Sequence, residues 1–341
     1  MAQNRFKWVD NAKGLAMISV VLCHVVSGLY EADLYPNSND FLYAIRNICN
    51  IFQMPLFCMV SGYLYDKAYI DKEGLIKKER LLRQIKSLLS IYVLWCLIMG
   101  VFKICMSGSV NFEVKPLDLA LIWFKPIGVY WYLYVLVGLY VLFALRNKVK
   151  VNDVIILVFL FVVGLVASLL VNNEGSLFAF RRIAYYAIIF YLGTFIDKLD
   201  KKTINIIAII FGIVAISLTV LFWNQDDEIY HIPIVNLFTA IGYCIAVIAL
   251  IRSISDKINL SHLSYVGKNS LDIYLLHVFF AAGGRMVINK IGNIQAWISV
   301  IGLFVVALYI PLLIGIVLRK LGLYDIFFKP YIFIEKHKKT K

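Results

Sequence analysis

The stretch WVDNAKGLAMISVVLCHVVSGLY, residues 8–30, decides the fold class. It begins with polar and charged residues, continues as an apolar run, and carries His24 inside that run. A bilayer core of about 30 Å requires roughly 20 apolar residues in a helix, so the stretch predicts a membrane-spanning helix. It has no convincing signal-peptide cleavage site and further apolar runs follow it, so we expect it to be retained as the first span.

The rest of the chain repeats this pattern. Hydrophobic residues make up 61% of the sequence, charged residues 16%, and the mean hydropathy is +0.80, values outside the range of soluble globular proteins. The predicted spans are residues 13–30, 42–64, 87–107, 129–145, 153–171, 183–197, 203–223, 233–251, 270–289 and 296–318. The sequence therefore predicts an all-α polytopic membrane protein with about ten transmembrane helices. No linker, repeat or fused soluble domain is apparent, so residues 1–341 are expected to form a single membrane-embedded domain.

The distribution of positive charge predicts the orientation. The net charge is +13 and the pI about 9.3, but the basic residues cluster between apolar runs, as membrane-flanking charges do, which argues against nucleic-acid binding. With the N-terminus in the cytoplasm, only eight of the 34 Lys and Arg residues fall outside the cytoplasmic segments. These are Arg46, Lys103, Lys115, Lys125, Arg181, Arg182, Arg285 and Lys290. Together with the even number of spans, this places both termini in the cytoplasm.

The six cysteines indicate neither a metal site nor a disulfide framework. All lie in or beside apolar segments, without CxxC spacing and without interleaved histidines. They are interpreted as small buried hydrophobic residues.

His24 is the first candidate for chemistry. It follows Lys13 by eleven residues, about 16 Å along a helix, which places it near the middle of the bilayer. An ionisable side chain at that depth faces the protein interior or a water-filled cavity. A neutral imidazole there can accept a proton; the alternative is a histidine that only hydrogen-bonds a neighbouring helix.

A second candidate is the basic stretch KKERLLRQIK, residues 77–86. Arg80 and Arg83 are three residues apart, so they share one face of a helix, with Lys77 one turn earlier. Such a pair of guanidinium groups can hold phosphates bidentately. The alternative is an ordinary positively charged cytoplasmic loop.

Five stretches occur in an order typical of the acyltransferase-3 family. They are WVDNAKGLAMISVVLCHV, FQMPLFCMVSGYLYDKA, RLLR, VYWYLYVLVGLY and SLDIYLLHVFF. The chain resembles that family from Trp8 to about Leu318, and most closely its branch related to fucose 4-O-acetylase. The resemblance implies an O-acyltransferase of the bacterial inner (cytoplasmic) membrane. It implies transfer of an acetyl or other acyl group from cytoplasmic acyl-coenzyme A to a hydroxyl of a sugar, surface polysaccharide or lipid-linked glycan. Acyl-coenzyme A would be a co-substrate, with no tightly bound cofactor and no metal.

The resemblance also implies roles for single residues. His24 matches the catalytic histidine of the first helix, and Arg80 and Arg83 match the RxxR motif. Where the wider family has an arginine before the histidine, this chain has Lys13, and Asp10 and Lys13 are expected to form the charged set at the inner mouth. Lysine is only a point charge, so bidentate phosphate binding is not expected there.

These assignments combine into one hypothetical mechanism. The coenzyme A head would bind among Arg80, Arg83, Lys13 and Lys77, and the pantetheine arm would reach toward His24. His24 would either deprotonate the acceptor hydroxyl or carry the acyl group itself.

His277 in SLDIYLLHVFF is a further catalytic candidate. It lies roughly 13 Å into its predicted helix, a depth at which it could approach the cavity of His24. It would orient the catalytic ring or stabilise an oxyanion, or else make a structural hydrogen bond.

The acceptor is expected to meet cations at the outer ends of helices. Arg46, Arg181 and Arg182 are predicted to bind a sugar hydroxyl, a uronate or a lipid phosphate; headgroup anchoring is the alternative. Trp131, in the VYWYLYV stretch, is predicted to stack on a sugar face, although Trp and Tyr also form the interfacial belt.

Two other classes of function compete with the enzyme. A proton-coupled exporter or transporter also has intramembrane His and Arg, but the chain shows no inverted repeat, and the phosphate-binding arginines occur at one mouth only. A structural component of polysaccharide synthesis would keep its function when His24 is replaced.

Overall fold

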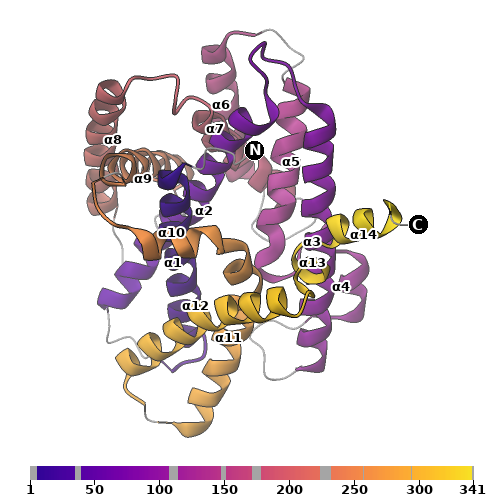
Figure 1. Cartoon of the computed structure of the whole chain (residues 1–341). Coiled ribbons are helices and arrows are strands. Elements are labelled where there is room, and N and C mark those ends of the chain that lie inside the picture. Colours follow the sequence, from indigo (N-terminus) through magenta and orange to yellow (C-terminus); the bar gives the residue numbers. More distant parts are fainter. Residues whose placement is uncertain are drawn as a thin grey trace. The chain divides into compact units, whose positions relative to one another are not determined.

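The structure, a computed structural model, describes residues 6–34, 40–106, 114–146, 151–170, 178–222, 232–255, 257–292 and 294–339. Within these ranges the chain is helical and contains no β-strand (Figure 1). One isolated antiparallel bridge joins Ile70 to Ile76. The predicted all-α fold class is confirmed.

The chain divides into two compact units, which are described separately. The first unit comprises Met1–Ser61 and Leu192–Leu312, and the second comprises Gly62–Tyr191 and Leu313–Lys341. Helices of the first unit are α1 (Lys7–Tyr30), the start of α2 (Asp40–Tyr69), α8 (Lys201–Leu221), α9 (Pro233–Ile254), α10 (Ser261–Lys268), α11 (Ser270–Ile291) and most of α12 (Ala296–Lys320). Helices of the second unit are the end of α2, α3 (Lys78–Cys105), α4 (Pro116–Ala120), η1 (Gly128–Tyr130), α5 (Trp131–Arg146), α6 (Asp153–Leu170), α7 (Phe178–Gly193), the end of α12, α13 (Tyr324–Phe328) and α14 (Pro330–Lys339).

Eight helices of the described chain are long and apolar enough to cross a membrane. They correspond to eight of the ten predicted spans. The remaining two predicted spans form α6, a shorter apolar helix, and α7, which has 16 residues. At 1.5 Å per residue α7 is about 24 Å long, less than a typical bilayer core.

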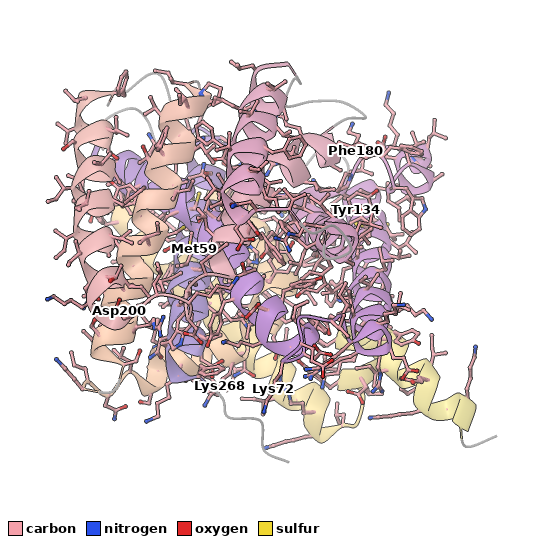
Figure 2. All side chains as sticks on the ribbon, turned by 90° about the horizontal axis from the view of Figure 1, so that it is seen from above. Met59, Lys72, Tyr134, Phe180, Asp200 and Lys268 are labelled. Carbon is pink, nitrogen blue, oxygen red and sulfur yellow. The ribbon has the colours of Figure 1, made fainter. Side chains whose placement is uncertain are left out.

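The faces that these helices turn outward are apolar. On α6, Val154, Val158 and Val162 follow one another at four-residue spacing and are 65%, 58% and 51% exposed. Phe180 on α7 is also exposed (Figure 2). Large contiguous apolar surfaces are rare on water-soluble monomers, whereas hydrocarbon solvates them. The surface agrees with a polytopic membrane protein.

In the first unit, α1 and α10 touch along their backbones. A Cβ atom added to Gly14 would collide with the carbonyl oxygen of Leu263, and one added to Gly267 would collide with the carbonyl oxygen of Asp10. Only glycine permits helices to approach this closely. The glycine of the DNAKG stretch is therefore a packing residue.

Polar side chains join the start of α1 to the end of α9 in the same unit. The Nδ2 atom of Asn11 donates to the hydroxyl of Ser255 at 2.9 Å, and both residues are buried. Arg252, one turn earlier on α9, donates to the Ile196 carbonyl at 2.9 Å and to the Asp197 carboxylate at 3.1 Å. Because buried polar atoms are costly without partners, these bonds fix how the helix ends meet.

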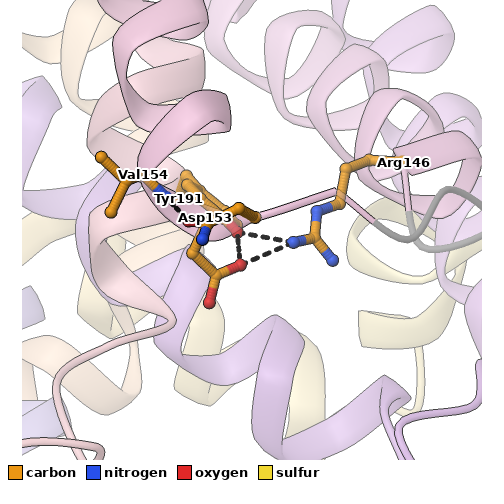
Figure 3. A network of polar contacts seen from close by, with 5 residues as sticks. Arg146, Asp153, Val154 and Tyr191 are labelled. Atoms are coloured by element: carbon orange, nitrogen blue, oxygen red, sulfur yellow. Dashed lines mark hydrogen bonds and ion pairs between the residues drawn. The ribbon is translucent and has the colours of Figure 1, made fainter.

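A network of three side chains joins α5, α6 and α7 in the second unit (Figure 3). One terminal nitrogen of Arg146 lies 2.7 Å from the carboxylate of Asp153 and 2.7 Å from the hydroxyl of Tyr191. The Tyr191 hydroxyl also donates to the Asp153 carboxylate. Charge-assisted bonds of this kind are the stronger ones, so they hold the two shorter helices against α5.

The segment after α12 runs back along α3. The indole nitrogen of Trp95 donates to the carbonyl of Phe327 at 2.9 Å, and the Tyr331 amide donates to the Ser90 hydroxyl at 3.2 Å. The pairing of 95 with 327 and of 90 with 331 makes the two segments antiparallel.

A hydrogen bond between α13 and α14 holds this segment together. Lys336 donates to the carboxylate of Asp325 at 2.7 Å. This bond lowers the pKa of the Asp325 carboxyl below its ordinary value.

We expect Gly267→Ala to destabilise the first unit by about 1–3 kcal/mol, because the added methyl group forces α1 and α10 apart. Gly302→Ala on α12 is the matched control, since nothing lies within 4 Å of its Cβ position; helix propensity favours alanine there. Thermal unfolding in detergent measures both variants. Equal midpoints would contradict the close backbone contact.

Candidate functional site

The two predicted catalytic histidines lie together in the first unit. The rings of His24 on α1 and His277 on α11 have centroids 5.2 Å apart and are tilted by 46°. His277 is fully buried, whereas His24 is partly exposed. Of the two rings, His24 is therefore the one that retains accessible surface.

Hydrogen bonds define the tautomer of His277. Its Nδ1 atom lies 2.9 Å from the carbonyl oxygen of Ile273 and 3.0 Å from that of Tyr274. A carbonyl oxygen can only accept, so Nδ1 carries the proton and, in the neutral ring, Nε2 has a lone pair. The Nε2 atom is buried and has no hydrogen-bond partner among the described residues. His277 thus presents a buried acceptor nitrogen that has no hydrogen-bond donor among the described residues.

Arg46, predicted to bind substrate, belongs to the same group of side chains. Its Nε atom donates to the hydroxyl of Ser27 at 3.0 Å, and Ser27 lies one turn after His24 on α1. The guanidinium is close enough for its charge to act on His24. The structure therefore brings together three of the predicted site residues in the first unit.

Asp10 and Lys13 lie at the opposite end of α1. Asp10 precedes His24 by 14 positions, about 21 Å along the helix, and is buried at 4% exposure. At that separation its carboxylate does not touch the His24 ring. The role that stays a prediction for Asp10 is to form, with Lys13, the charged set at the start of α1.

In the second unit, Arg80 and Arg83 lie on the first two turns of α3, on one exposed face. The helix begins nine residues before the apolar segment, because hydropathy registers only the buried part of a spanning helix. The Arg80 guanidinium lies 5.9 Å from the ring centroid of Tyr69, at the end of α2. The stretch predicted as phosphate-binding is thus a helix start, not a loose loop.

The link from α2 to α3 is a tight turn that orients these arginines. The backbone amide of Lys77 donates to the carbonyl of Tyr69 at 2.8 Å, and its ammonium group lies 3.2 Å from the carbonyl of Ile70. The carboxylate of Asp71 accepts from the amide of Leu75 at 2.8 Å. Lys77 therefore lies at the base of α3, three residues before Arg80.

Arg83 forms an ion pair with the segment after α12. One of its terminal nitrogens lies 2.8 Å from the carboxylate of Glu335 on α14. A carboxylate is a planar anion that mimics the charge of a phosphate oxygen pair. Arg83, which is expected to bind the acyl donor, is therefore paired with the carboxylate of Glu335 in the same protein.

Two residues predicted separately for the acceptor meet in the second unit. The guanidinium of Arg182 on α7 lies 3.8 Å from the ring centroid of Trp131 on α5, within range of a cation–π contact. Tyr186, one turn after Arg182, stacks on the same indole at 5.9 Å. One face of Trp131 is therefore covered by protein, which limits sugar stacking. Arg181, the neighbouring predicted residue, is half-buried.

Sequence reasoning identified Arg46 on α2 but missed the polar residues Asn50 and Gln53 on the same helix. Arg46, Asn50 and Gln53 recur at four- and three-residue spacing on an otherwise apolar helix. The Nε2 atom of Gln53 donates to Asn50 at 3.1 Å, while its Oε1 atom is buried without a hydrogen-bond partner among the described residues. This spacing was the signal that could have identified them.

Arg285 on α11 was also not singled out as a site residue. Only 8% of it is exposed, and it lies 3.4 Å from the carbonyl of Gly28 on α1. Among the described residues, no three His, Cys, Asp or Glu side chains are grouped so that they could hold a metal ion.

Comparison with protein families supplies the identity. Residues 6–316 match the model of Acyl_transf_3, described as an acyltransferase domain. No curated protein and no solved structure matches the chain. The matched region includes His24, His277 and the RLLR stretch and ends before α13. Since this match covers nearly all of a chain with eight helices apolar enough to span a bilayer, the protein belongs to the acyltransferase-3 family and is a membrane acyltransferase.

Proposed function

We propose that this acyltransferase moves an acetyl or other acyl group from cytoplasmic acyl-coenzyme A to a hydroxyl of a sugar in a surface or lipid-linked glycan, with His24 as the catalytic residue. The observation that carries the proposal is the contact between His24 and His277 inside two apolar helices. Intramembrane ionisable groups face the protein interior and mark functional sites. The glycan acceptor, the fucose-acetylase branch and the bacterial inner (cytoplasmic) membrane rest on the family resemblance.

The tautomer of His277 suggests how His24 is held. The Nε2 lone pair of His277 would accept an N–H from His24, and the other nitrogen of His24 would then carry a lone pair toward the substrate. His277 would act as a positioning residue, comparable in logic to the group that orients the histidine of a hydrolase triad.

In the general-base route, His24 removes the proton from the acceptor hydroxyl as the oxygen attacks the thioester carbonyl. The tetrahedral intermediate collapses, the carbon–sulfur bond breaks, and the coenzyme A thiolate takes the proton from His24. In the second route the same nitrogen attacks the thioester carbonyl, the carbon–sulfur bond breaks, and the coenzyme A thiolate leaves. The acceptor hydroxyl then attacks the acyl-imidazolium, its proton passes to the thiolate, and the neutral imidazole is released. Both routes require His24 to be neutral at the start.

The donor head carries a pyrophosphate and a 3′-phosphate, and we expect Arg80, Arg83 and Lys77 to bind these groups. Their support is the shared exposed face at the start of α3. Guanidinium groups hold phosphates bidentately, whereas the lysine acts as a point charge. Arg181, Arg182 and Trp131 are still proposed to contact the acceptor. Arg182 and Trp131 would do so as a cation–π pair.

Replacing His24 tests the core of the proposal. We expect His24→Ala to lower acyl transfer from acetyl-coenzyme A by about 10²–10⁴-fold, the usual contribution of a general base. The measurement follows radiolabelled acetyl-coenzyme A hydrolysis and any label retained on the purified protein in nanodiscs. His262→Gln, which alters an exposed histidine bonded to Tyr309, should leave the rate unchanged. Normal turnover in His24→Ala would refute the assignment.

Replacing His277 tests the positioning role. His277→Phe keeps a ring but removes the lone pair, so we expect kcat to fall at least about tenfold, equivalent to about 1.4 kcal/mol, with the KM for acetyl-coenzyme A unchanged. The pH–rate profile should also change shape, since the partner of His24 is gone. A loss of protein stability with an unaltered pH profile would indicate a structural role only.

Arg83 and Glu335 should affect donor binding in opposite directions. Arg83→Ala is expected to weaken acetyl-coenzyme A binding about tenfold, because a charge-assisted bond is lost. Glu335→Gln is expected to strengthen it several-fold, since exposed ion pairs are worth at most about 1 kcal/mol. Equilibrium binding of labelled acetyl-coenzyme A measures both. Lys72→Ala, in the exposed turn before α3 (Figure 2), is the control, and equal affinities in all three variants would exclude the phosphate role.

A further inference from the structure

In the second unit, α14 contacts the basic face at the start of α3. Arg83, Lys86 and Ser90 recur at three- and four-residue spacing, so they share one face of α3. One terminal nitrogen of Arg83 lies 2.8 Å from the carboxylate of Glu335 on α14. The Lys86 ammonium lies 5.8 Å from the ring centroid of Tyr331, whose amide donates to the Ser90 hydroxyl at 3.2 Å. α14 therefore lies on the face of α3 that carries Arg83.

The two ends of the segment formed by α13 and α14 are held differently. Phe328 on α13 is fully buried, with its ring 5.8 Å from that of Trp95, and the Trp95 indole donates to the carbonyl of Phe327 at 2.9 Å. At the other end, the side chains of Arg83 and Glu335 are 56% and 27% exposed. Exposed ion pairs are weak because water and salt screen them. The segment is thus anchored at α13, and the Glu335 end of α14 can be released without loss of that anchor.

Glu335 comes from outside the residues that match the family. The match ends at residue 316, whereas α13 begins at Tyr324. Arg83 belongs to the RLLR stretch inside the match. The ion pair therefore joins an appended segment to a motif of the acyltransferase domain.

Glu335 offers Arg83 the same kind of partner that coenzyme A offers. Carboxylate and phosphate both present anionic oxygens to the donors of a guanidinium. The carboxylate occupies a donor that a phosphate would use, and its negative charge repels an approaching phosphate. The two anions therefore compete for one arginine.

We propose that α14 is an autoinhibitory segment, in which Glu335 holds Arg83 until a phosphate of coenzyme A displaces it. This inference rests on the proposed function, in which Arg83 binds the acyl donor. Because binding is reciprocal, the donor loosens the end of α14 by the same factor by which α14 weakens donor binding. The enzyme thus requires a higher donor concentration than its arginines alone would need.

Binding of the two halves of coenzyme A tests the competition. The purified protein in phosphatidylcholine nanodiscs is titrated with adenosine 3′,5′-bisphosphate, which carries phosphates, and with pantetheine, which carries none. Glu335→Gln should strengthen binding of the bisphosphate about two- to fivefold, the range of an exposed ion pair, and leave pantetheine unaffected. Glu73→Gln removes an equal charge from the exposed turn before α3 and should change neither affinity. Equal bisphosphate affinity in Glu335→Gln and wild type overturns the inference.

Hydrogen exchange of backbone amides measures the release of α14. Adding acetyl-coenzyme A to the wild-type protein should speed exchange in residues 331–339, whereas residues 324–328 should stay protected by their anchor. Arg83→Ala should show the faster exchange in α14 without donor, and the donor should then change it little. Exchange in α14 that is unaltered or slowed by the donor in the wild type would mean that Glu335 only stabilises the fold.

The two proposals fail separately. Arg83→Ala reports whether Arg83 binds the donor, and Glu335→Gln reports whether α14 competes with it. Donor binding that depends on Arg83 but not on Glu335 refutes only the present inference. Absence of acetyl-coenzyme A binding, or binding that is insensitive to Arg83→Ala, refutes the proposed donor site and the inference with it.

Discussion

An imidazole inside an apolar helix is tolerated only where other groups satisfy its polar atoms. His277 meets this condition on one side, because carbonyls of its own helix accept from Nδ1. Whether its other nitrogen, Nε2, has a hydrogen-bond donor depends on which residues of α1 lie beside it. The register between α1 and α11 is therefore critical, and α10 sets it. Gly267 holds α10 against α1, and α11 begins three residues later at Ser270.

The same constraint gives the first unit two opposite polar regions. At the start of α1, Asn11 donates to Ser255, and this bond anchors the helix to the end of α9. Further along α1, His24 contacts His277, whose Nε2 atom has no hydrogen-bond partner among the described residues. The first region joins two helix ends, and the second is the candidate site.

The sequence predicted the helical fold, eight of the spans and the position of His24 within the first apolar helix, because hydropathy and helical rise are local properties. From its depth in the helix, His277 was predicted to be able to approach the cavity of His24. The sequence did not predict the contacts between Trp131 and Arg182 or between Arg83 and Glu335, because these depend on packing that no spacing encodes. The sequence also did not predict where α3 begins, because its charged first turns lie outside the apolar window. The pairing of α6 and α7 with α5 through Asp153 and Tyr191 explains how two shorter helices keep their place.

The antiparallel contact of the last segment with α3 also bears on biosynthesis. Trp95 and Phe327 are 232 residues apart in the chain, so the second unit is assembled from pieces made early and late in translation. Contacts of such long sequence separation form slowly and only after both partners exist. The ribosome must therefore deliver nearly the whole chain before this last segment can pack on α3. Until then, Trp95 and Arg83 lack their bonds to Phe327 and Glu335.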